Sequence, residues 1–213
     1  MEKCNIDNYW NNFYFSQKEK VKNSLPSQFA VFMLTELQNN SHIIIDIGCG
    51  NGKDSFFFLD FNHYVIGVDR SREAISYCNS IKKESISFIN SSIDNDELID
   101  KINCILKDNK KPKVIYSRFF LHAINEIQQE NLLKLARDLL KKGELFFLEF
   151  RTEKDKYQIK QTKEHYRRFI NPNDFILQAI KYDFKINYFI EGFGFAKYHI
   201  DDAHVARFIL EAV

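Results

Sequence analysis

The 213-residue chain carries no excess of either charge, and its formal net charge at pH 7 is +1. A surface that binds nucleic acid through its general field needs a net positive charge, so this balance gives no support for a nucleic-acid partner. No apolar run approaches membrane-spanning length, and the first residues form no apolar signal segment. We therefore expect a cytoplasmic protein that has no membrane partner.

Cysteine is scarce as well. We interpret the side chain of Cys49 as a small buried filler, because a thiol nucleophile needs a basic partner nearby. The sequence predicts reduced thiols and no metal site, because its cysteines are widely spaced and form no C-x-x-C pair: they are Cys4, Cys49, Cys78 and Cys104.

Repeats, low-complexity tracts and flexible linkers are also absent from the sequence. The length falls within the usual range for one domain, so we expect residues 1–213 to form a single domain. Aromatic residues make up 15% of the chain, and 21 of them are phenylalanines. This content favours a densely packed aromatic interior or a ligand cavity.

Three of only seven glycines stand at alternate positions in the segment Asp46-Ile47-Gly48-Cys49-Gly50-Asn51-Gly52. The pattern predicts a strand, a sharp turn and a helix whose free N–H groups face a ligand. A second acid, Asp69, ends the next apolar run and can hold a ribose diol. The G-x-G-x-G spacing differs from the G-x-G-x-x-G of dinucleotide sites. Asp46 would repel a pyrophosphate but can accept from an ammonium group, which suits the amino-acid end of S-adenosylmethionine.

These motifs resemble those of class I S-adenosylmethionine-dependent methyltransferases. Residues 46–52 match the first motif of the family, D/E-x-G-x-G-x-G, and residues 65–69 match the second. The resemblance implies S-adenosylmethionine as cofactor and a Rossmann-like α/β fold. Its seven-stranded sheet would have the order 3-2-1-4-5-7-6, with an antiparallel last strand and helices on both faces. The (N/D)-P-P-Y/F motif of some N-methylating relatives is missing, which argues against methylation of DNA adenine or a glutamine amide.

The pattern along the chain alternates between strands and helices, as a doubly wound sheet requires. Helices are predicted at about 52–60, 71–82, 94–107 and 125–141. Strands are predicted at 42–47, 63–68, 85–90, 112–117, 143–150, 183–190 and 193–200, the last two as a hairpin that turns at Glu191-Gly192.

Two additions flank this core. We expect residues 1–40 to form an N-terminal helical extension of two helices, the second starting near Pro26. Such an extension often covers the cofactor pocket in the family, although its aromatic stripe is equally consistent with a core-facing helix. Residues 151–174 are predicted to be a substrate cover, because an open α/β fold builds its acceptor site at the carboxyl edge of the sheet.

Several cofactor contacts follow from the resemblance. Ser92 stands where many relatives have an acid that accepts from the adenine amino group, and a serine oxygen accepts with less charge assistance. We expect Ile93 to pack on the ring and interpret Asp94 as a helix N-cap. The full predicted set of cofactor-binding residues is Asp46, Gly48, Cys49, Gly50, Asp54, Asp69, Arg70, Ser92, Ile93 and Ser117.

For the acceptor, His122 is the first candidate for a general base, and His165 and Tyr14 are held in reserve. A histidine satisfied by the backbone is the alternative for His122. The predicted substrate-binding residues are Arg118, Arg151, His165, Tyr166 and Arg168. A guanidinium binds phosphate or carboxylate through a planar fork, so convergent arginines suggest an anionic acceptor. Alternatively, the arginines pair with nearby acids and only organise the loops; those acids are Glu149, Glu153, Asp155 and Glu164.

Other segments, including residues 9–14 and 116–123, resemble a bacterial subgroup associated with capsule and surface-polysaccharide synthesis. This resemblance implies O-methylation of a sugar hydroxyl or a phosphate-like group on a capsule precursor. Two alternatives stay open: a methyltransferase acting on an unrelated metabolite or protein, and a non-catalytic paralogue that binds the cofactor as a partner subunit. The oligomeric state is not predicted.

Overall fold

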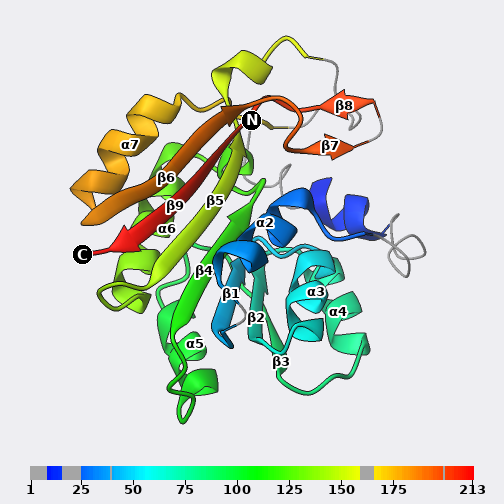
Figure 1. Cartoon of the computed structure of the whole chain (residues 1–213). Coiled ribbons are helices and arrows are strands. Elements are labelled where there is room, and N and C mark those ends of the chain that lie inside the picture. Colours follow the sequence, from blue (N-terminus) through cyan, green and yellow to red (C-terminus); the bar gives the residue numbers. More distant parts are fainter. Residues whose placement is uncertain (1–8, 16–24, 39, 159–165, 199) are drawn as a thin grey trace. The chain divides into compact units, whose positions relative to one another are not determined.

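The computed structural model describes residues 9–15, 25–38, 40–158, 166–198 and 200–213 (Figure 1). Contacts divide the chain into two compact units, residues 1–113 and 114–213. The first unit has a helical segment at 9–15 and then these elements: α2 (Gln28–Glu36), β1 (Ile43–Ile47), α3 (Lys53–Asp60), β2 (Tyr64–Asp69), α4 (Arg72–Ser80), β3 (Ile86–Asn90) and α5 (Leu98–Leu106).

The second unit contains the remaining strands and helices. In chain order these are β4 (Lys113–Arg118), η2 (Leu121–Ala123), α6 (Glu126–Leu139), β5 (Leu145–Arg151), η3 (Glu153–Asp155), α7 (Pro172–Lys181), β6 (Phe184–Gly192), β7 (Lys197–Tyr198), β8 (Asp201–Asp202) and β9 (Val205–Ala212). Helix α7 packs against β6, and the neighbouring aromatic rings of Phe150, Phe175 and Phe208 fill the core of this unit.

The strands form a seven-stranded sheet in the order β3-β2-β1-β4-β5-β9-β6, and β7 pairs with β8 in a separate two-stranded sheet. Strand β2 is parallel to β1 and β3, β4 is parallel to β5, and β9 is antiparallel to both β5 and β6. The predicted Rossmann-like α/β fold is thus confirmed. The seventh strand of the main sheet, labelled β9, lies between the fifth and the sixth, as predicted.

Two helix starts in the first unit are set by serine caps. The hydroxyl of Ser27 accepts from Ala30 N at the start of α2, and that of Ser71 accepts from Ala74 N at the start of α4. Pro26 therefore precedes the cap of α2 instead of lying in its first turn. Helix α2 buries Phe29 and Met33 completely, which confirms a core-facing stripe.

The prediction of a last strand at 193–200 was wrong. The strand is β9, at Val205–Ala212, and residues 193–204 form a connection that contains the short pair β7 and β8. Strand β9 has neighbours on both sides, and seven of its eight residues are buried. Such a strand reads as a continuous apolar run, and it lacks the alternation that identifies a half-exposed strand.

Two helix predictions also need correction. The sequence reading missed α7, although Asn171 caps it and Pro172 begins it, a typical start signal. Helix α5 begins at Leu98 with Glu97 at the cap position, so the interpretation of Asp94 as an N-cap was wrong. Asp94 lies in a turn before the helix.

In the part of the chain that the structure describes, no helix combines the length and apolar character needed to cross a membrane.

His63, at the start of β2, provides a test of the fold. Its Nδ1 accepts from His42 N, which only a neutral ring can do, and the side chain is buried. Burial, with help from His42 and Lys111, lowers the pKa of His63 from 6.5 to about 4. The unfolded chain therefore takes up this proton at a higher pH than the folded chain, so the stability is lost as pH falls from 6.5 through 4.

We expect His63→Asn, whose amide oxygen can accept the same bond without titrating, to reduce the loss of stability between pH 6.5 and 4. Urea unfolding of both proteins across this range measures the difference, because all other titrating groups are shared. Parallel pH profiles would contradict the assignment.

Candidate functional site

The glycine segment of the first unit forms a tight loop between β1 and α3. Gly48 N and Cys49 N both donate to Val68 O, at 2.8 and 3.1 Å, which ties the loop to β2. Gly48, Gly50 and Gly52 all have positive φ, of 80°, 54° and 76°. Glycine is required at such positions because a Cβ is strained there.

Gly50 is constrained a second time by the N-terminal helical segment. A Cβ on Gly50 would lie 2.2 Å from the hydroxyl oxygen of Tyr14, so this aromatic ring sits directly against the loop. The segment is anchored by Asn11, whose Oδ1 accepts from Ser71 Oγ at 2.9 Å. Tyr14 thus packs against the glycine loop, and a cover over a cofactor pocket stays a prediction for this segment.

Tyr14 was predicted as a reserve base. Burial, followed by the nearby Asp69, raises its pKa well above 10. A phenol that holds its proton so firmly is suited to donate a hydrogen bond at neutral pH and poorly suited to accept a proton. Its catalytic role stays a prediction, with donation favoured.

Asp46 lies in the fully buried strand β1, and its carboxyl group has no cationic partner among the described residues. Its described partner is a neutral group, the hydroxyl of Ser55, which donates to Oδ2 at 2.5 Å. Burial raises the pKa of Asp46 to about 8; it outweighs the hydrogen bond from Ser55, which lowers the pKa, and Asp54 and Asp69 add smaller upward contributions. Among the described residues no Lys, Arg or His pairs with it.

Asp69 holds the loop from the end of β2. Its Oδ2 accepts from Gly50 N and its Oδ1 accepts from Ser71 N, both at 2.8 Å. Burial raises the pKa of Asp69, against these backbone hydrogen bonds. A carboxylate has about four acceptor directions, so both oxygens keep capacity for a ligand diol.

The end of β3 carries a second polar cluster of the first unit. Ser92 Oγ donates to Asp94 Oδ2 at 3.4 Å and accepts from Asp94 N at 3.3 Å. Ile93, the residue between them in the sequence, is buried. Asp94 attracts the guanidinium of Arg70, which is half-buried. The carboxylate that relatives place at the position of Ser92 is thus replaced here by a serine with an acid beside it.

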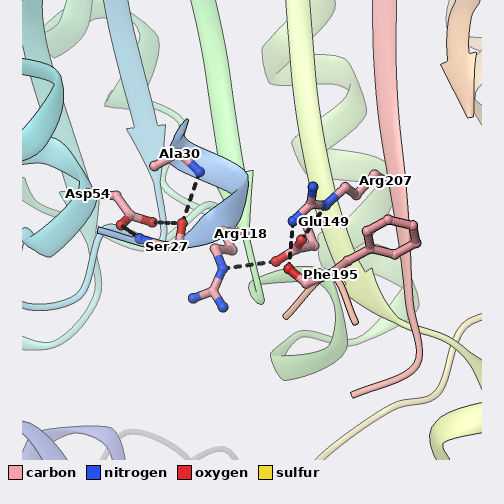
Figure 2. A network of polar contacts seen from close by, with 7 residues as sticks. All are labelled: Ser27, Ala30, Asp54, Arg118, Glu149, Phe195 and Arg207. Carbon is pink, nitrogen blue, oxygen red and sulfur yellow. Dashed lines mark hydrogen bonds and ion pairs between the residues drawn. The ribbon is translucent and has the colours of Figure 1, made fainter. Parts of the chain in front are cut away.

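Asp54 has a clear structural function. Both of its oxygens bind Ser27: Oδ1 accepts from the backbone N at 2.8 Å and Oδ2 from the hydroxyl at 2.7 Å (Figure 2). The same hydroxyl caps α2 by accepting from Ala30 N. Asp54 therefore joins the start of α2 to the first turn of α3, and its predicted cofactor contact stays a prediction.

In the second unit, a row of three charged residues crosses neighbouring strands. Arg118 on β4, Glu149 on β5 and Arg207 on β9 are register partners. Glu149 has no exposed surface, and it accepts from Arg118 Nε at 2.9 Å and from Arg207 Nε at 2.7 Å (Figure 2). Arg207 Nη2 also donates to Phe195 O at 2.7 Å.

Arg151 belongs to another buried network. Its guanidinium donates to Asp155 Oδ2 and to Asp201 Oδ2, each at 2.7 Å. Burial lowers its pKa, but the hydrogen bonds to these two acids outweigh burial and raise the pKa overall. Asp155 Oδ1 accepts from His204 N as well. The alternative of loop-organising ion pairs is therefore observed for Arg118 with Glu149 and for Arg151 with Asp155.

His122 lies in η2 and is buried, with its ring edge-on to Phe119 at 5.2 Å between centroids. Phe119 follows β4 with a positive φ of 55°, an uncommon conformation for a bulky residue. The neighbouring guanidinium of Arg118 lies over the Phe119 ring, 4.2 Å from its centroid. Ser117, at the end of β4, is fully buried.

Arg168 is connected to His122 through the backbone, since Arg168 N donates to His122 O at 2.8 Å. Its side chain donates from Nη2 to the amide oxygen of Gln129, and Tyr166 and Glu126 act on it only through electrostatic attraction. His165, the remaining predicted substrate residue, lies outside the described residues.

The structure thus brings Asp46, Gly48, Gly50 and Asp69 together in one unit, and His122 and Arg168 in the other. Sequence reasoning missed several residues that hold these groups; they are Asn11, Ser27, Gln129, Gln178, Asp201 and Arg207. Of these, Gln129 alone left a signal in the sequence. It lies on the buried face of the amphipathic helix α6, where an apolar side chain is expected. Among the described residues, no cluster of three or more His, Cys, Asp or Glu could hold a metal ion.

Residues 38–191 match the family described as a methyltransferase domain, so the chain belongs to this family. A SAM-dependent methyltransferase from Anabaena variabilis ATCC 29413 is 23% identical, with a TM-score of 0.74 over 98% of this chain and 96% of that one. A glycopeptide N-methyltransferase, MtfA, in complex with S-adenosylmethionine is 12% identical, with a TM-score of 0.66 over 90% of this chain and 96% of that one.

A curated relative is the probable inactive serine/threonine-protein kinase fnkD of Dictyostelium discoideum, which is 25% identical over 111 residues. The match covers 48% of this chain and only 15% of that protein.

The buried row predicts a large stability effect. Glu149→Gln removes the charge that both Arg118 and Arg207 face, and breaking a buried ion pair costs about 3–5 kcal/mol. We expect urea unfolding to show a loss of that order. Glu153→Gln is the matched control: Glu153 is exposed, and among the described residues its side chain bonds the amide of Asn171 alone, so its change should stay within about 0.5 kcal/mol. Equal losses in the two variants would refute the neutralising role of Glu149.

Proposed function

We propose that this chain is an S-adenosylmethionine-dependent methyltransferase that O-methylates a small anionic or sugar-type acceptor. The observation that carries the cofactor assignment is Asp46, a buried carboxylate without a cationic partner among the described residues, set beside a glycine loop. The α-ammonium group of S-adenosylmethionine would supply the missing positive charge. Family membership, the similar fold of a SAM-dependent methyltransferase and that of an N-methyltransferase in complex with S-adenosylmethionine support the same cofactor.

The residues of the first unit fit this cofactor in kind. Asp46 would hold the ammonium group, the backbone of the glycine loop would line the amino-acid end, and Asp69 would accept from the ribose hydroxyls. Ser92 offers an acceptor for the adenine amino group, with Ile93 for the ring. When bound, S-adenosylmethionine supplies an electrophilic methyl group on its sulfonium, and the acceptor would displace the thioether in line. Positioning of the two reactants therefore accounts for much of the rate.

The second unit supplies candidates for the acceptor. His122 is the proposed base, because an imidazole can take the proton of a hydroxyl acceptor near neutral pH. The resemblance of residues 9–14 and 116–123 to a subgroup associated with capsule synthesis favours a sugar-type or phosphate-like precursor in a bacterial cytoplasm. No role for nucleic acid or membrane is proposed.

Calorimetric titration with S-adenosylhomocysteine tests the cofactor site through Asp69. We expect Asp69→Asn to weaken binding by roughly 1.5–3 kcal/mol, because the ribose hydroxyls lose a charged acceptor. Asp60→Asn, on the exposed end of α3, should bind like the unaltered protein. If Asp69→Asn keeps its affinity, Asp69 does not hold the ribose; if the unaltered folded protein does not bind, the proposed function fails.

Asp46 predicts how cofactor binding depends on pH. In the free protein its pKa of about 8 leaves it protonated at neutral pH, whereas an ammonium ligand requires the carboxylate. Binding therefore releases a proton, and affinity should fall as pH drops, approaching about tenfold per unit between pH 6 and 7.5. The same titrations with Asp46→Asn should lose most of this dependence. An unchanged profile in that variant would show that another group titrates.

A further inference from the structure

The arginines of the second unit differ in how their charge is balanced. Arg118 and Arg207 share Glu149, and Arg151 faces Asp155 and Asp201. Arg168 has no carboxylate within ion-pair distance among the described residues, although its side chain is half-buried. Glu126, a carboxylate that attracts it from outside this distance, is exposed and so screened by solvent.

Arg168 is held instead by a chain of neutral amides. Its Nη2 donates to Gln129 Oε1, and Gln129 Nε2 in turn donates to Gln178 Oε1. A guanidinium can only donate, so Gln129 must turn its oxygen to Arg168 and its nitrogen to Gln178. Gln129 is buried on α6 and Gln178 lies on α7, so two helices fix the side chain.

A neutral brace has a different consequence from an ion pair. A carboxylate in the place of Gln129 would orient Arg168 equally well and would also cancel its charge. The two amides orient the fork and leave a full positive charge in a partly desolvated place, where a charged hydrogen bond to an anion is strong. Burial accordingly lowers the pKa of Arg168.

We propose that Arg168 is the residue that binds the anionic group of the acceptor, a phosphate or a carboxylate, and that Gln129 and Gln178 are positioning residues that orient it without neutralising it. The proposal deepens the proposed function, on which it rests, by limiting the acceptor to molecules that carry such a group. It also separates Arg168 from Arg118 and Arg151, each of which is paired with a carboxylate within the fold. The backbone of Arg168 is hydrogen-bonded to the backbone of His122, so the anion would be bound near the proposed base.

The test compares two substitutions of Gln129 in the full chain. Gln129→Glu keeps the hydrogen bond to Arg168 but adds a negative charge, whereas Gln129→Met removes the bond at similar volume and stays neutral. We expect Gln129→Glu to weaken binding of inorganic phosphate, followed by phosphorus NMR, at least tenfold, and Gln129→Met to weaken it less. A merely structural role predicts the reverse order, because Met leaves the guanidinium without its acceptor.

Gln128→Glu is the matched control. It lies one residue away on α6, adds the same charge, and preserves the capping box in which Gln128 faces Asn125. Phosphate binding should be unchanged in this variant. An equal effect of Gln128→Glu and Gln129→Glu, or no phosphate or acetate binding by the unaltered protein, overturns the proposal. A parallel titration with acetate distinguishes the two anions, because the one that binds more tightly indicates whether the acceptor carries a phosphate or a carboxylate.

Titration of every variant with S-adenosylhomocysteine separates this proposal from the proposed function. Cofactor binding should stay within about twofold in the Gln129 variants, because Asp46, the glycine loop, Asp69 and Ser92, to which the proposed function assigns the cofactor, lie in the other unit. Cofactor binding with an unaltered phosphate response in Gln129→Glu refutes the anion site alone. Loss of cofactor binding already in the unaltered protein refutes the methyltransferase assignment itself.

Discussion

The second unit depends on the neutralisation of Glu149, a carboxylate with no exposed surface in the middle of three paired strands. Burying one charge without a partner costs several kcal/mol, so β4 and β9 must each bring an arginine to the same row. The register of both strand pairs is then tied to this requirement, since a slip of one residue would turn every side chain to the other face. Arg118 and Arg207 are consequently held close to the fold, and Arg118 also covers the Phe119 ring.

The first unit shows the opposite arrangement. Asp46 is as deeply buried as Glu149, but a serine hydroxyl takes the place of the arginines. In the absence of a ligand, the raised pKa of Asp46 keeps its carboxyl group largely neutral near pH 7, so an unpaired buried charge is avoided. A buried acid that the fold leaves without a cation is useful where a cationic ligand arrives, and such groups concentrate at functional sites. In the proposed function the negative charge of Asp46 would thus depend on a ligand, whereas that of Glu149 is stabilised by the fold itself.

The alternation of strands and helices and the loop at Gly48 could be predicted from local patterns in the sequence, whereas the sheet order was implied by the resemblance to a known family. The position of β9 could not be predicted, since a strand buried on both faces gives an apolar run without alternation. The partners of the arginines were also beyond reach. Arg151 and Asp201 are 50 residues apart, and only the connection between β6 and β9 brings Asp201 to Arg151. Arg118, Arg151 and Arg168, which looked equivalent in sequence, therefore proved different in the fold.

This difference narrows what the acceptor can be. If the arginines had all been without carboxylate partners, their joint charge would have favoured a polyanion; with Arg118 and Arg151 paired to carboxylates, the charge of Arg168, which is held by amides, would match one phosphate or carboxylate. A single anion-binding residue contributes a limited affinity, so the rest of the acceptor must be recognised by less polar contacts. Exposed aromatic side chains near the β7 and β8 strands, Phe193 and Tyr198, belong to the same unit and have the ring faces that a sugar can pack against. The proposed acceptor, one anionic group on a sugar-type body, would thus be bound by Arg168 through its charge and by such rings through its apolar faces.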